Sequence, residues 1–202
     1  MPSPGSPPDF FALSRVVTTT RSSHVSSSTE PTEPTKPTEP TGVPGGELIT
    51  DRLVLRTWTA AEAAAVAAGD RLPGWAPDFP AEGDGVIAGL LGENPAWLGE
   101  YGHRLIVERA TGLVVGSIGL FWPPSGGVVE IGYGVVPSRR GRGYAPEATR
   151  ALTDHALGAP GVRTVSAGVE TANPASVRVL EKAGFRHQGT EDGVAVYHAR
   201  RG

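Results

Sequence analysis

The sequence predicts a mixed α/β (α+β) domain in which helices cover the faces of one central sheet. Apolar and alternating runs typical of strands are interspersed with alanine- and leucine-bearing helical runs, in the order β-α-α-β-β-β-α-β-α-β. In addition, Val128–Leu157 combines a strand, a basic glycine-bearing loop and a helix start. A chain builds an anion pocket from backbone amides in this way.

The composition excludes several classes of protein. The 202 residues suggest one domain, and 39% hydrophobic residues are enough for one core. The absence of cysteine excludes disulfides, thiolate zinc sites and a cysteine nucleophile. The net charge of −3 gives no general attraction to nucleic acid or membranes, and no apolar run approaches the roughly 20 residues of a membrane helix. We expect a cytoplasmic protein, because the first residues also lack the basic region of a secretory signal.

Residues 1–46 are predicted to form a disordered extension, and residues 47–202 the folded domain. The extension is dense in Pro, Ser and Thr, and a three-residue TEP/TKP repeat begins at Thr29. Such a repeat favours extended polyproline II and offers nothing to bury. A docking or modification segment and a misassigned upstream start codon are the alternatives.

The domain is predicted to begin with a strand over Leu48–Thr57 and a helix over Ala60–Ala68. Thr59 is placed as the N-cap of that helix, Glu62 completes a capping box, and Gly69 ends the helix.

A Pro/Gly-rich loop is expected over Leu72–Gly85, followed by a short helix over Val86–Leu91. Trp75 and Phe79 in this loop are expected either to fill the core or to wall a ligand pocket.

The middle of the domain is predicted to be β-structure. Strands over His103–Arg109 and Leu113–Phe121 form a hairpin around the turn Ala110–Gly112. Another turn, Pro123–Gly127, leads into the central strand Val128–Val136. After the basic loop, helices and strands are expected to alternate. A helix over Pro146–Leu157 is followed by a strand over Arg163–Val169, then by a helix over Ala175–Ala183 capped by Gly184, and last by a strand over Val194–His198.

The loop Ser138–Ala145 is the strongest candidate for a binding site. The first amides of a helix lack intrahelical partners and carry the positive end of its dipole, so a phosphate can sit on them. Gly141 and Gly143 allow a tight turn and a close approach of backbone to ligand. The loop is neither a P-loop, which needs GxxxxGK[ST], nor a dinucleotide fingerprint, because the third glycine of GxGxxG is missing.

Arg140-x-x-Gly143-x-Ala145 matches the R/Q-x-x-G-x-G/A signature that cradles the pyrophosphate of coenzyme A in the GNAT N-acetyltransferases. Two further segments, Glu130–Pro137 and Asn173–Phe185, resemble motifs of the same family, and they follow in the same order and with the same separations as in that family. Over about residues 47–200 the chain resembles the ribosomal-protein-alanine and small-amine branch of the family. The resemblance implies the GNAT fold, with a mixed sheet splayed at the cofactor site and flanked by helices, and acetyl-CoA as cosubstrate.

The resemblance also implies which residues hold acetyl-CoA. Backbone groups of the central strand would pair with the pantetheine, loop amides would hold the pyrophosphate, and one asparagine would hydrogen-bond the pantetheine arm. These residues are Val135, Val136, Arg140, Gly141, Arg142, Gly143, Tyr144, Ala145 and Asn173. Alternatively, Arg140 and Arg142 are solvated surface side chains, and Asn173 is a loop cap.

Glu130 is the candidate general base, because it is the carboxylate on the central strand. Alternatively it pairs with an arginine or binds the amine without taking its proton. Ser176 matches the family motif and is the candidate general acid for the leaving thiolate, although its hydroxyl could instead bond to the helix backbone. Tyr133 and Tyr144 are the fallback donors, because the family tyrosine of the second motif is absent.

The resemblance implies an N-acetyltransferase that transfers an acetyl group from acetyl-CoA to a primary amine by direct attack in a ternary complex. The amine is a protein N-terminus or a small molecule, bound by variable segments such as Leu72–Leu91. A cysteinyl acyl-enzyme is impossible without cysteine. The alternative is a non-catalytic acyl-CoA-binding or regulatory module.

The expected partners are acetyl-CoA and the amine acceptor, and the chain is expected to be a monomer or homodimer. No metal is expected, because the five histidines show no ligand spacing. No nucleic acid is expected, because the arginine cluster Arg139–Arg142 lacks interleaved aromatic residues. No membrane is expected either, because no apolar run is long enough for a membrane helix.

Overall fold

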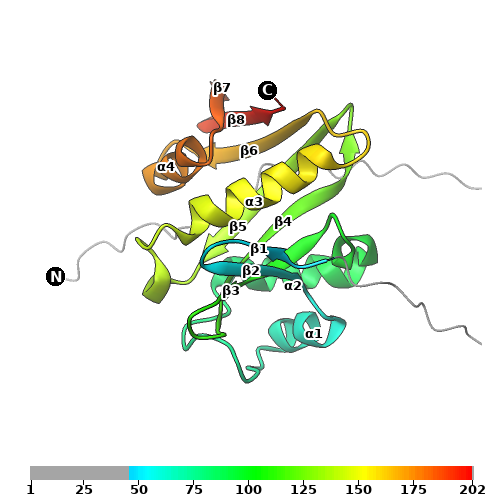
Figure 1. Ribbon diagram of the computed structural model, residues 1–202, viewed down its shortest axis with the longest axis vertical. Helices are drawn as coiled ribbons and strands as arrows, with labels where there is room; N and C mark the ends of the chain where they lie inside the picture. The colour runs from blue at the N-terminus through cyan, green and yellow to red at the C-terminus, as the bar shows by residue number, and fades with distance from the viewer. Residues whose placement is uncertain (1–45, 202) are drawn as a thin grey trace, which may run out of the picture.

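The computed structural model describes residues 46–201, which form one eight-stranded sheet with helices on both faces (Figure 1). The disordered extension predicted over residues 1–46 lies outside these residues, apart from Gly46. The predicted mixed α/β architecture is confirmed.

Strands follow one another in the sheet in the order β1-β2-β3-β4-β5-β6-β8-β7. The strands are β1 (Leu48–Ile49), β2 (Leu53–Thr57), β3 (His103–Glu108), β4 (Val114–Ser125), β5 (Val128–Val135), β6 (Thr164–Glu170), β7 (Arg186–Glu191) and β8 (Val194–Arg200). The helices are α1 (Ala60–Ala68), α2 (Glu82–Glu93), α3 (Tyr144–Gly158) and α4 (Pro174–Lys182), and two 3₁₀ turns are η1 (Pro95–Leu98) and η2 (Pro137–Arg139). Within residues 46–201, no helix has the length and apolar character needed to cross a bilayer.

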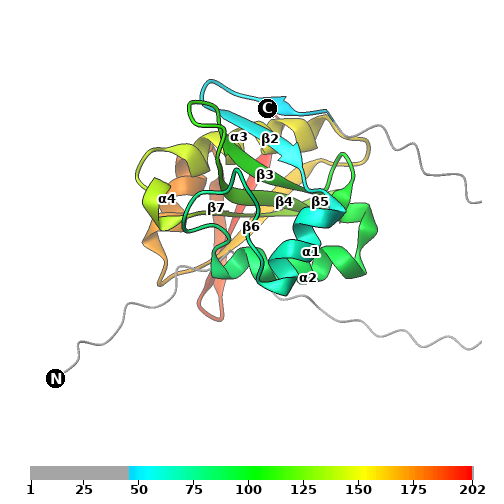
Figure 2. The ribbon, with the colours of Figure 1, turned by 90° about the horizontal axis from the view of Figure 1, so that it is seen from below.

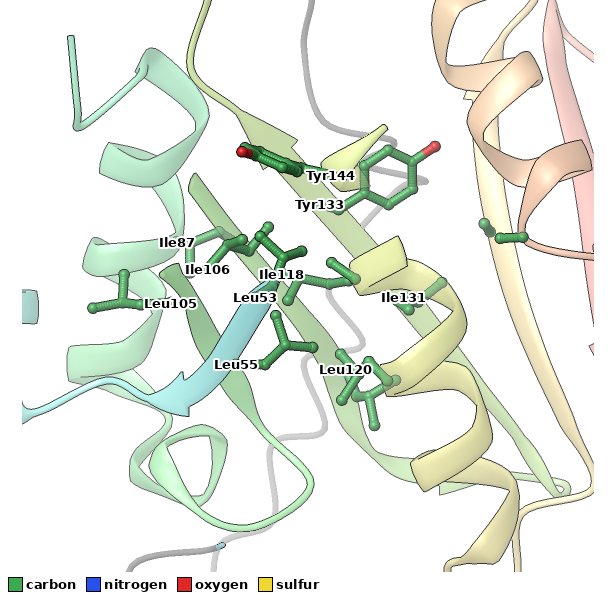
Figure 3. Packing of buried hydrophobic residues seen from close by; sticks show 14 of the residues in the cluster. Leu53, Leu55, Ile87, Leu105, Ile106, Ile118, Leu120, Ile131, Tyr133 and Tyr144 are labelled. Carbon is green, nitrogen blue, oxygen red and sulfur yellow. The ribbon is translucent and has the colours of Figure 1, made fainter. Parts of the chain in front are cut away.

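Helix α3 covers one face of the sheet, with α4 packed beside it, and α1 and α2 cover the other face (Figure 2). Alternation along β2 turns Leu53 and Leu55 to the α3 face, where both are fully buried. Ile118 of β4 lies with them, whereas Leu105 of β3 lies toward Ile87 of α2 (Figure 3). The core therefore has two layers, one on each face of the sheet.

The sheet divides into two arms after Glu130. Neighbouring strands are antiparallel except β5 and β6, which pair in parallel at three positions, the last of them Glu130 with Ser166. Both strands continue, but β5 then pairs only with β4, as far as Val135, and β6 only with β8, as far as Glu170. The predicted splay of the central sheet is confirmed, and it exposes one edge of β5.

The start and end signals of α1 are confirmed. The Thr59 side chain accepts a hydrogen bond from the amide of Glu62 at 3.1 Å, and the Glu62 carboxylate accepts one from the amide of Thr59 at 3.0 Å. Gly69 ends the helix in the left-handed conformation, with φ of 77°.

Several elements differ from the sequence prediction. The strand predicted over Leu48–Thr57 is divided by a turn into two antiparallel strands, β1 and β2. Helix α2 begins at Glu82 instead of Val86, because Asp84 accepts a hydrogen bond from the Ala81 amide and so caps a glycine-bearing first turn. Strand β4 continues through Pro123 and Pro124 to Ser125, so that only Gly126 and Gly127 of the predicted turn Pro123–Gly127 remain a turn. Strand β7 was not predicted, because its residues are largely exposed and polar and leave no alternating pattern.

Candidate active site

A cleft of about 620 Å³ lies where the two arms of the sheet separate. Its walls are the exposed end of β5, the loop before α3 with the first turn of that helix, the start of α4, and part of the segment between α1 and α2. The residues that line it include Tyr133, Val135, Arg140, Gly141, Gly143, Tyr144, Ala145, Asn173, Ser176, Asp78 and Lys182. The fold thus brings together most of the binding residues that the sequence predicted.

The backbone of β5 presents Val135 to this cleft. The Val136 amide donates to the Val115 carbonyl of β4 at 2.9 Å, so alternation along the strand turns the N–H and C=O of Val135 toward the other side. The Val135 carbonyl accepts a hydrogen bond from Arg140 Nε at 3.0 Å. The carbonyl of Val136 accepts from the amide of Arg139, and its side chain is fully buried. Val135, and not Val136, therefore turns an amide to a ligand, beside a carbonyl that already accepts from Arg140.

The loop after β5 forms a cradle of amides. Gly141 and Gly143 have φ of 75° and 80°, a conformation that favours glycine, and Gly143 is the N-cap residue of α3. Within residues 46–201, the amides of residues 141–145 donate to no protein acceptor. These N–H groups lie at the positive end of the α3 dipole, so the site suits a negatively charged group.

Glu108, which sequence analysis missed, anchors this loop from the sheet. Its carboxylate is 3% exposed and accepts hydrogen bonds from the hydroxyls of Thr111 and Tyr144, at 2.6 and 2.5 Å. Arg139 and Arg142 reach the same carboxylate, at 3.4 and 3.6 Å. The hydrogen bond from Thr111, followed by the one from Tyr144, lowers the pKa of Glu108. The only sequence signal was a carboxylate that ends an apolar strand.

Asn173 and Ser176 meet at the start of α4. Asn173 Oδ1 accepts a hydrogen bond from the Ser176 amide at 3.0 Å, so the loop-cap role considered for Asn173 is present. Both residues also line the cleft. The Ser176 carbonyl accepts from the Tyr133 hydroxyl at 3.1 Å, and this bond connects β5 to α4 across the cleft.

The two fallback tyrosines point in opposite directions, Tyr133 toward α4 and Tyr144 away from it (Figure 3). Burial raises the pKa of Tyr133. The hydrogen bond to Glu108 raises the pKa of Tyr144. Both hydroxyls already donate to protein oxygens, to Ser176 and to Glu108 respectively.

Glu130 lies at the apex of the splay, at the last paired position of β5 and β6. Its side chain is half-buried and is not among the residues that line the cleft. Alternation along β5 places it on the face opposite Tyr133, which is the face covered by α1 and α2. Glu130 and Ser176 therefore lie on different sides of the central strand.

On the α2 side there are two carboxylates that sequence analysis did not single out for the site, Asp78 in the segment between α1 and α2 and Asp84 in the first turn of α2. Asp78 lines the cleft and accepts hydrogen bonds from the amide and hydroxyl of Ser138. Asp84 is 2% exposed, and burial raises its pKa to about 6 although Ser117 and the Ala81 amide donate to it.

Trp75 and Phe79, in contrast, are core residues. They are 6% and 0% exposed, and their rings pack edge to face with the centroids 5.1 Å apart. No group of three or more metal-binding side chains is found among the described residues.

In sequence, the chain has relatives among bacterial N-acetyltransferases. The uncharacterized N-acetyltransferase YjdG of Bacillus subtilis (strain 168) is 34% identical over 90 residues, which are 43% of this chain and 54% of that protein. The probable N-acetyltransferase YjcK of the same organism is 36% identical over 89 residues, 43% of this chain and 49% of that protein. The chain spans about half the length of these curated relatives.

The fold is shared with solved acetyltransferases. An acetyltransferase from Agrobacterium tumefaciens str. C58 superposes with a TM-score of 0.57 at 24% identity, covering 85% of this chain and 100% of that one. RimL, a ribosomal L7/L12 alpha-N-protein acetyltransferase in complex with coenzyme A, superposes with a TM-score of 0.57 at 17% identity. The superposition covers 77% of this chain and 98% of that one. The family model of the acetyltransferase (GNAT) domain matches residues 52–186. This match takes in β5 and β6, between which the sheet splays, together with the amide cradle and α4, and the chain belongs to the GNAT acetyltransferase family.

Proposed function

We propose that this protein is an N-acetyltransferase that transfers an acetyl group from acetyl-CoA to a primary amine by direct attack in a ternary complex. One observation carries the proposal. The amide cradle of residues 141–145 lies at one end of a cleft whose wall is the unpaired edge of β5. A cosubstrate that combines a pyrophosphate with an amide-bearing arm fits both features.

The chain's own groups define how acetyl-CoA would be held. The amides of Arg142, Gly143, Tyr144 and Ala145 would bind the pyrophosphate, and Gly141 would provide the turn. We assign the pantetheine contact to Val135, because its amide is turned to the cleft, whereas both backbone groups of Val136 are used within the protein. Arg140 and Asn173 line the cleft and would add hydrogen bonds there.

Glu130 is the proposed general base. An amine arrives as an ammonium ion and must lose a proton before it can attack a thioester carbonyl. The position of Glu130, on the α2 side of β5 at the apex of the splay, suits an acceptor that enters from the α2 side, where Asp78 lines the cleft. The freed amine then attacks the carbonyl, the C–S bond breaks, and the Ser176 hydroxyl protonates the departing thiolate. The proton that the nitrogen loses as the amide forms restores the Ser176 hydroxyl.

The acceptor is proposed to be a protein N-terminus or a small-molecule amine, bound near the segment between α1 and α2. Asp78 lines that end of the cleft, and its carboxylate can attract an ammonium group. Among the structural neighbours are a putative ribosomal-protein-serine acetyltransferase from Vibrio cholerae and a spermidine N-acetyltransferase chimera, one for each acceptor class.

Calorimetric titration of the full chain with acetyl-CoA tests the proposal. We expect binding by the natural chain and its loss in Gly143→Glu, because a side chain is strained at a φ of 80° and its Cβ would lie 3.3 Å from Arg52 Nη2, which distorts the cradle. Gly161→Glu is the matched control, because Gly161 has φ of 79° in open space at the far end of α3. No binding by the natural chain would overturn the proposal. Binding without turnover on any amine would identify the non-catalytic module instead.

A further inference from the structure

Arg52, in the turn between β1 and β2, contacts the back of the amide cradle. Its Nη1 donates to the Arg142 carbonyl at 2.7 Å and its Nη2 to the Gly143 carbonyl at 3.3 Å, across about 90 residues of sequence. The guanidinium also lies 5.1 Å from the ring centroid of Tyr144. One side chain therefore binds two successive peptide groups of the loop.

Arg52 is itself held in place by Glu147 of α3. Arg52 Nε donates to Glu147 Oε2 at 2.7 Å, and the Arg52 amide and the Thr50 hydroxyl donate to Oε1, at 3.0 and 2.6 Å. Burial acts to raise the pKa of Glu147, but the hydrogen bonds from Thr50 and Arg52 outweigh it and lower that pKa. The carboxylate is thus charged at neutral pH and fixes the orientation of the guanidinium fork.

The orientation of these carbonyls decides where the amides point. A trans peptide is planar, so its C=O and N–H point in opposite directions. Because Arg52 binds the carbonyls of Arg142 and Gly143, the amides of Gly143 and Tyr144 are directed away from it. Arg52 lines a second hollow of about 390 Å³, and it is not among the residues that line the main cleft. The two amides therefore face the side on which the cleft lies.

We infer that Arg52 is a positioning residue for the pyrophosphate group of acetyl-CoA, which acts by fixing the peptide groups of the cradle without touching the cosubstrate. The inference rests on the proposed function. Gly143 adopts a φ of 80°, and a glycine peptide turns over readily when nothing holds it. Arg52, with Glu147 behind it, holds the loop in the binding conformation before the ligand arrives, which reduces the ordering cost of binding.

The experiment measures dissociation constants of the full chain for coenzyme A and for pantetheine, which lacks the pyrophosphate. In Arg52→Gln we expect the dissociation constant for coenzyme A to rise about tenfold or more, because hydrogen bonds from a charged donor are lost. The constant for pantetheine should stay within about twofold, since pantetheine does not reach the loop. Arg52→Lys keeps the charge but not the fork, so it should also weaken coenzyme A binding.

Arg109→Gln is the matched control. Arg109 likewise donates to two backbone carbonyls, those of Thr50 and Asp51 at 2.9 and 2.8 Å, but makes no bond to the cradle. The affinity of the Arg109→Gln variant for coenzyme A should match that of the natural chain.

Unchanged coenzyme A affinity in Arg52→Gln and Arg52→Lys would overturn this inference but not the proposed function. Equal weakening of pantetheine binding would also overturn it, because Arg52 would then support the fold in general. If Arg52→Gln does not fold, Arg52→Lys decides by the same comparison. No binding of coenzyme A by the natural chain would overturn the proposed function together with this inference.

Discussion

The carboxylate of Asp78 accepts two hydrogen bonds from Ser138, one from its amide at 2.8 Å and one from its hydroxyl at 2.7 Å. The pair joins the segment between α1 and α2 to the residues that follow the central strand. Because that segment is the proposed acceptor side and Ser138 precedes the amide cradle, the contact links the two binding regions of the site.

Replacing Asp78 by Ala should destabilise the protein by about 1–2 kcal/mol at neutral pH, because two hydrogen bonds to a carboxylate are lost. Burial acts to raise the pKa of Asp78, but the hydrogen bonds from Ser138 outweigh it and lower that pKa. Its stabilisation is therefore present above the unfolded pKa of about 3.9 and is lost as the pH falls below it. Urea unfolding at pH 7 and pH 3 measures this, and an equal cost at both values would contradict it.

Glu130→Gln should lower kcat by about 10²–10⁴-fold, the usual contribution of a general base. The loss should be greatest at low pH, where nearly all the amine is protonated and the base is needed most. The pH profile of kcat with any accepted amine measures it. Glu181→Gln, an exposed change on α4, is the control. A profile of the same shape and height as that of the natural chain would remove Glu130 as the base.

Ser176→Ala isolates the hydroxyl of Ser176. The two hydrogen bonds that the structure shows for this residue use its backbone amide and carbonyl, so the cap with Asn173 and the contact with Tyr133 should persist. We expect a lower kcat with little change in the dissociation constant for acetyl-CoA. Steady-state kinetics and calorimetry on the same preparation separate the two, and full turnover in the variant would exclude Ser176 as the general acid.

Asp84→Asn should stabilise the protein above about pH 6. Burial raises the pKa of Asp84 to about 6, so the folded state holds its proton more tightly than the unfolded state does. The associated stability is present below the unfolded pKa and is lost as the pH rises through 6, by up to about 3 kcal/mol. The carboxamide introduced by the substitution is neutral at every pH, and its oxygen can still accept from the Ala81 amide.

Melting temperatures of the natural chain and Asp84→Asn between pH 5 and pH 8 measure this difference. The Tm of the natural chain should fall relative to that of the variant as the pH rises. Parallel curves would show that Asp84 does not titrate in this range, and Asp154→Asn, an exposed change on α3, should give such curves.

Local signals in the sequence determined most elements of this protein. The Thr59–Glu62 capping box and Gly69 bounded α1 correctly, because a cap depends on residues within one helical turn. Gly141 and Gly143 marked the two positions with positive φ in the cradle for the same reason, since glycine adopts that conformation without a steric penalty. The cleft residues of β5, the loop and α4 followed from the same segments and from their family resemblance.

The tertiary structure alone decided which distant groups support those elements. The parallel pairing of β5 with β6 ends at Glu130, and nothing near Glu130 in the sequence marks that position. Glu108 reaches Tyr144, and Arg52 reaches Gly143, only because the antiparallel order of β2, β3, β4 and β5 brings these strands beside the cradle. Local sequence sets backbone conformation through sterics and capping, whereas contacts between residues far apart in the chain depend on how the whole sheet is assembled.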